Sequence, residues 1–69
     1  MEVGALYVWV VYANNALTKY HGRECLYLGE DVIHSEIHGV TIINHRIMMV
    51  GDGTESLLDK TCLKYLQKK

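Results

Sequence analysis

The sequence has no phenylalanine and no proline, and only two cysteines among its 69 residues. Disordered segments are usually rich in proline and poor in apolar residues, whereas this chain is 49% hydrophobic, so we expect it to fold. Two cysteines, Cys25 and Cys62, are too few for a disulfide framework, and both have apolar neighbours. We therefore expect two free thiols that are buried.

An excess of charge of either sign is also absent. The formal net charge is −1 and the pI is about 6.4, which excludes a large field that would attract a polyanion. The length fits a single small domain over residues 1–69, and such a domain buries only about 60% of the surface of its unfolded chain. Domains with so small a core often gain stability from a disulfide, a metal or a partner subunit.

No apolar run is long enough to cross a membrane as a helix. The most apolar segment, residues 3–13, is well short of the roughly 20 residues that a bilayer requires. The residues before it are Met1 and Glu2, and a signal peptide would carry base there. We interpret the segment as a strand, and we expect a cytoplasmic protein with no membrane partner.

Turn-forming residues recur at short intervals through the first part of the chain, as they do between strands. Residues between the turns are rich in valine, isoleucine and tyrosine, which favour strands. The pattern predicts strands near residues 3–13, 24–29, 32–37 and 40–50. Residues 14–21 fit either a short helix capped by asparagine or a strand returning from an Asn14-Asn15 turn, and we favour the helix.

A hairpin turn at His38-Gly39 joins the last two of these strands. A two-residue loop there places Ile37 opposite Val40 and Ile33 opposite Asn44. The face that carries these residues is largely apolar, so we expect it to meet the core. The opposite face is mixed, as expected for a sheet with one face partly in water.

The C-terminal segment has the pattern of an amphipathic helix. Asp52 and Glu55 have the spacing of a capping box, and an apolar stripe follows at helical spacing, formed by Leu58, Cys62, Tyr65 and Leu66. The predicted fold class is therefore α+β: an antiparallel meander of four to five strands packed by a C-terminal helix, with a short helix after the first strand as an option.

The first strand is apolar on both faces, and one helix covers only one of them. Surplus apolar strand surface favours association, so we expect a homodimer that also binds another protein. Function as a small accessory protein follows: a regulator, an inhibitor or an assembly component. Aromatic residues commonly anchor protein interfaces, and the candidates are Tyr7, Trp9, Tyr12 and Tyr27.

Two other kinds of site are alternatives. Lys60, Lys64 and Lys68 recur every four residues and would form a basic ridge for nucleic acid on the predicted helix. His34, Glu36 and His45 could share one side of the hairpin and bind a metal such as zinc. The sequence contains no specific catalytic or cofactor motif, so we expect neither enzymatic activity nor a cofactor.

Overall fold

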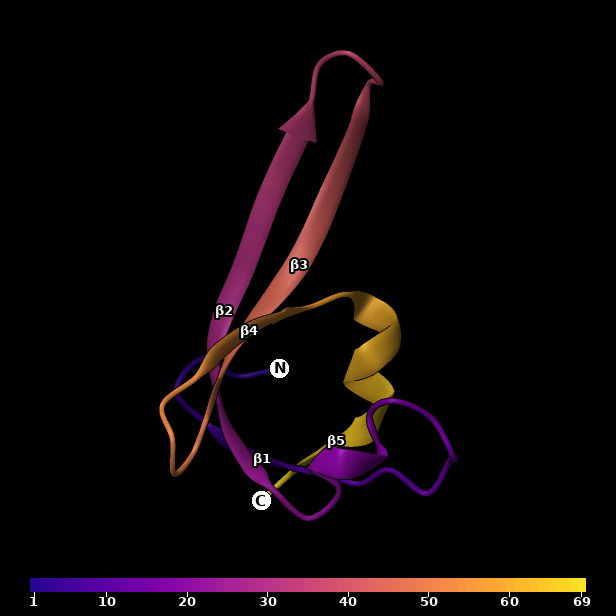
Figure 1. The fold of residues 1–69 in the computed structure, drawn as a ribbon. Helices are drawn as coiled ribbons and strands as arrows, with labels where there is room; N and C mark the ends of the chain where they lie inside the picture. Colours follow the sequence, from indigo (N-terminus) through magenta and orange to yellow (C-terminus); the bar gives the residue numbers. More distant parts are fainter.

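The computed structural model describes residues 1–69 and consists of five β-strands and two 3₁₀ helices (Figure 1). In chain order the elements are β1 (Leu6–Trp9), η1 (Thr18–Tyr20), β2 (Glu24–Ser35), β3 (Val40–Met49), β4 (Glu55–Leu58), η2 (Lys60–Tyr65) and β5 (Leu66–Lys68). The chain contains no α-helix. The predicted α+β class is therefore wrong, and the fold is all-β.

All five strands belong to one antiparallel sheet in the order β4-β3-β2-β1-β5. The first four form a meander, and β5 returns to the far side of β1, where Trp9 pairs with Leu66. The sheet part of the prediction thus agrees with the structure, whereas the helix that was expected to pack on the sheet is missing.

The chain forms a turn and a strand where the C-terminal helix was predicted to begin. Asp52 accepts a hydrogen bond from the Thr54 N–H at 2.9 Å, which closes a turn, and Glu55 then enters β4 opposite Met48. Gly51 and Gly53 have φ angles of 109° and 72°, which suit a tight turn between β3 and β4. The intrinsic preference for helix is a few tenths of a kcal/mol per residue, and pairing along β3 overrides it.

Two other local predictions are also corrected. The strands predicted at 24–29 and 32–37 form one strand, β2, with a bulge between Tyr27 and Gly29 in place of the expected turn. The loop of the β2–β3 hairpin has four residues, because Ser35 pairs with Val40 and Ile33 pairs with Ile42. Residues 14–21 contain only the single 3₁₀ turn η1.

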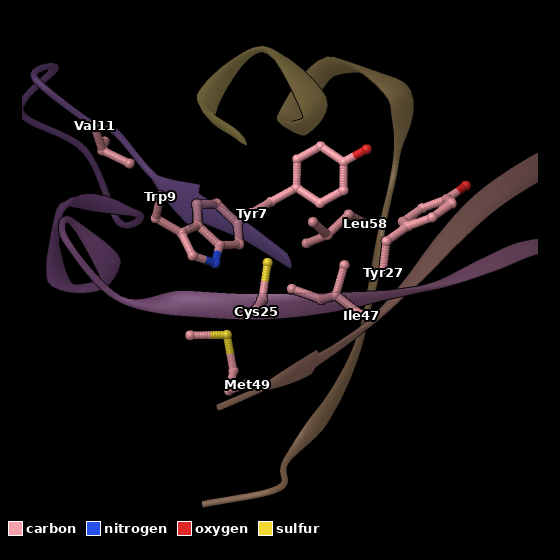
Figure 2. Close-up of a cluster of buried hydrophobic side chains, with 8 residues drawn as sticks. All are labelled: Tyr7, Trp9, Val11, Cys25, Tyr27, Ile47, Met49 and Leu58. Carbon is pink, nitrogen blue, oxygen red and sulfur yellow. The ribbon is translucent and has the colours of Figure 1, made fainter. Parts of the chain in front are cut away.

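The core lies on the concave side of the curved sheet. Its buried apolar side chains come from four strands and the segment after β1, and they point into one space, as Figure 2 shows: Tyr7, Trp9, Val11, Cys25, Tyr27, Ile47, Met49 and Leu58. The helix η2 contributes Cys62 and Tyr65 to this cluster. The predicted apolar stripe therefore does face the core, but from the two strands β4 and β5 and a 3₁₀ helix.

The molecule is elongated, with principal extents of 39 × 28 × 19 Å. The β2–β3 hairpin projects away from the other elements, which together form a compact body (Figure 1). We call residues 30–44 of this hairpin the arm. None of the buried core residues belongs to the arm.

Candidate functional site

The arm lacks neighbouring strands on both sides. β1 pairs with β2 only at Glu24–Leu26, and β4 pairs with β3 only at His45–Met48. Beyond these pairs the two strands of the arm pair only with each other. A two-stranded ribbon without a covering layer is marginally stable in water, so the arm has the form of a segment that gains stability from contact with another surface.

Apolar side chains occupy both faces of the arm. One face carries the cross-strand pair Ile33 and Ile42, and the other carries Val32 and Ile43. These four side chains are between 45% and 48% exposed. Val40 is 48% exposed, and Ile37 in the turn is 91% exposed. Exposed apolar residues scattered singly are ordinary, but a contiguous group of this kind marks an interaction surface.

The predicted orientation of the arm is reversed. On β3, Ile47 and His45 face the core, so by alternation Ile43 and Thr41 continue the core side of the sheet. Val32 pairs with Ile43 and lies on the same side, whereas Ile33 and Ile42 occupy the opposite side. The bulge after Tyr27 changes the alternation of β2, which a count along the sequence does not reveal.

A buried polar pair marks the base of the arm. The Tyr27 hydroxyl and His45 Nδ1 are 2.7 Å apart and share a hydrogen bond, and both residues are buried. Burial raises the pKa of the Tyr27 hydroxyl. The hydrogen bond satisfies two polar groups that would otherwise be costly to bury, so His45 is part of the packing that orients the arm.

Charge is unevenly distributed on the arm. Its acidic residues are Glu30 and Asp31 at the base and Glu36 in the turn, and it carries no lysine or arginine. On β3, the stretch Val40–Asn44 carries no charged side chain. A groove of about 440 Å³ lies beside this stretch and is bounded on the body by Asp59 and Lys60.

Three of the four predicted interface aromatics lie in the core. Tyr7, Trp9 and Tyr27 are at most 5% exposed, so they present almost no surface to a partner of the folded chain. Trp9 packs against Tyr20 with ring centroids 5.1 Å apart. Only Tyr12 is exposed, at 88%, and it lies outside the strands. With no phenylalanine in the chain, these aromatics fill the core.

The three lysines of the predicted basic ridge do not form one. Lys60 and Lys64 lie at different turns of η2, where three residues per turn separate positions i and i+4 by about 120°. Lys68 belongs to β5, where its Nζ is 2.6 Å from the Glu2 carboxylate, an ion pair that raises the pKa of Lys68. The predicted ridge depended on an α-helix that is absent.

The predicted metal ligands are also separated. Glu36 lies in the turn, and His34 contacts Thr41 with its Nδ1 3.1 Å from Oγ1. His45 pairs with Glu30, which lies four residues before His34 on β2. Four residues of a strand correspond to about 13 Å along the arm. No group of three histidine, cysteine or acidic side chains in the chain could hold a metal ion.

Sequence reasoning missed the aliphatic residues of the arm as interface candidates, although a signal was present. The run Val40-Thr41-Ile42-Ile43-Asn44 combines β-branched residues with no charge and no proline, a composition typical of strands that pair with other chains.

Both cysteines are free, and burial raises the pKa of each thiol.

No helix in the structure has both the length and the apolar character that a membrane crossing requires. Comparisons with protein-family models, with curated proteins and with solved structures gave no match to this chain.

Proposed function

We propose that the chain is a small protein-binding module, acting as a regulator, inhibitor or assembly component, and that the arm is its contact surface. The observation that carries this proposal is the arm itself, a projecting ribbon with aliphatic side chains on both faces. Two free thiols favour a reducing compartment, so we place the protein in the cytoplasm.

The chemistry of the arm suits binding better than catalysis. It presents the aliphatic side chains of Val32, Ile33, Ile42 and Ile43 without a covering layer. Six aliphatic side chains expose on the order of 500 Å² of apolar surface, which is divided between the two faces and the turn of the arm. Covering this surface on a partner protein is favourable because it removes apolar area from water.

A position-specific cross-link tests the proposal. A photoreactive phenylalanine analogue replaces Ile33 on the arm in one variant and Val50, 44% exposed in the turn after β3, in a matched control. We expect irradiation in an extract of the producing cells to give a discrete protein adduct with the arm variant and little with the control. Equal adducts at both positions, or none at either, would contradict the proposal.

A further inference from the structure

We propose that the partner of the arm is a second copy of this chain, joined edge to edge through the free part of β3, Val40–Asn44. This inference rests on the proposed function, since it names the occupant of the same surface. In the pair, the two β3 strands run antiparallel, with Ile42 of one copy opposite Ile42 of the other. The two arms then form a four-stranded ribbon.

The direction of the backbone groups on β3 supports this arrangement. The Met49 N–H donates to Thr54 O on the side of β4, and the next N–H, of Val50, donates to Glu24 O on the side of β2. Directions alternate along a strand, and the bulge in this hairpin lies on β2. Within the free part of β3, the groups of Thr41 and Ile43 therefore point away from β2, where no strand meets them.

Only one antiparallel register pairs all of these groups. With Ile42 at the two-fold axis, Thr41 of each copy lies opposite Ile43 of the other, and the two copies exchange four hydrogen bonds. Placing Thr41 opposite Thr41 moves Ile43 beside the Gly39 turn. Placing Ile43 opposite Ile43 brings Thr41 to His45, whose outer side already pairs with Leu58.

The free part of β3 also lacks the features that prevent edge pairing. Natural edge strands are protected by charge, proline or short length. The free edge of β2 carries Glu30 and Asp31, and the outer strands β4 and β5 have only four and three residues. Val40–Asn44 has none of these protections, and a second copy meets no like charge along it.

Apolar contacts add to the backbone hydrogen bonds of the dimer. Two arms together expose on the order of 1,000 Å² of apolar surface, and edge pairing covers the side chains beside the shared edge. The groove of about 440 Å³ beside Thr41–His45 leaves room for the side chains of an added strand. A strand added there also places its own aliphatic residues beside those of the first arm.

A disulfide tests the register. The substitution Ile42→Cys, made together with Cys62→Ser, places two thiols at a non-hydrogen-bonded pair with Cα atoms about 4.5 Å apart, within the disulfide range of about 4.4–6.8 Å. We expect mild oxidation to convert most of this variant into a covalent dimer of two 7.9 kDa chains. Asn44→Cys in the same background is the control, because its two thiols lie about 13 Å apart. Equal cross-linking of both variants, or of neither, would overturn the proposed register.

A proline tests the edge itself. Thr41→Pro removes an N–H that points away from β2, so the hairpin keeps its own hydrogen bonds while the dimer loses two by symmetry. We expect sedimentation to show at least a tenfold weaker dimer than for Thr41→Val, with the near-ultraviolet spectrum of Trp9 unchanged. A proline variant that dimerises as strongly as the valine variant would refute edge pairing.

The photo-cross-link separates this inference from the proposed function. An adduct between two copies of the chain supports both. An arm-specific adduct with a different protein, from a chain that sediments as a monomer of 7.9 kDa, supports the binding function and overturns the dimer. Absence of any arm-specific adduct counts against both.

Discussion

The contact between Tyr27 and His45 shows how single residues determine where the body ends and the arm begins. Both side chains face the core side of the sheet, one on each strand of the hairpin, immediately before the strands leave the body. Their rings lie 5.9 Å apart and their polar atoms share a hydrogen bond of 2.7 Å. The pair closes the core at the point where aliphatic residues no longer have a covering layer.

Removing the Tyr27 hydroxyl leaves His45 Nδ1 buried without its partner. We expect Tyr27→Phe to lower the free energy of unfolding by about 1–3 kcal/mol, the cost of an unsatisfied buried polar group. Urea unfolding followed by Trp9 fluorescence measures this change. Tyr12→Phe is the control, because the Tyr12 side chain is exposed and makes no hydrogen bond; equal effects of the two substitutions would contradict the argument.

At the scale of elements, the turn between β3 and β4 directs the start of the C-terminal segment into a strand and not a helix. Asp52 accepts the Thr54 N–H and also pairs with Arg23, with 3.1 Å between Oδ2 and Nη2. The Thr54 N–H, the Thr54 side chain and the Arg23 guanidinium hold the pKa of Asp52 below its ordinary value of 3.8. The carboxylate thus stabilises a turn that directs the chain into a strand.

This turn makes stability depend on pH in the acid range. Because the pKa of Asp52 is lower in the folded chain, its stabilisation is complete above pH 3.8 and is lost as the pH falls through the folded value. We expect the urea midpoint of the wild-type chain to fall between about pH 4 and pH 2, and Asp52→Asn to show a smaller fall over that range. A variant with an unchanged acid slope would indicate that other carboxylates, such as Glu2 and Asp59, carry the effect.

The elements also show which sequence patterns were decisive. Segments rich in valine, isoleucine and tyrosine correctly predicted strands in the regions of β1, β2 and β3, although β2 was predicted as two strands, because strand preference is largely a local property. The stripe from Leu58 to Leu66 has helical spacing, yet the same residues reach the core from β4, η2 and β5. The start of this segment forms a strand because β3 offers it backbone hydrogen bonds. The spacing of residues within the segment carries no information about that partner strand.

At the scale of the whole molecule, the core and the exposed apolar surface are in different places. The eight buried apolar residues lie in the body, whereas aliphatic residues 32–43 belong to the arm. The sequence indicated surplus apolar surface and attributed it to the first strand. In the structure one face of that strand is buried, and six of the twelve exposed large apolar side chains lie on the arm.

This separation predicts that the body folds without the arm. In a variant in which Asn-Gly replaces residues 32–43, a two-residue turn joins Asp31 to Asn44, which form a hydrogen-bonded pair across the hairpin. We expect the near-ultraviolet spectrum of Trp9 to be retained and association to be lost. The near-ultraviolet spectrum and sedimentation of the same sample measure both properties. Loss of the folded spectrum would show that the arm is needed for the core.

The sequence by itself determined that the chain folds, that it is rich in strands and that it has more apolar surface than a core this small can bury. These conclusions follow from composition and from local periodicity. Tertiary structure alone decided the C-terminal strands, the bulge after Tyr27 and the location of the free edge on β3. Those features depend on which backbone N–H and C=O groups already have hydrogen-bond partners. Many of these partners are distant in the sequence, so local patterns do not identify them.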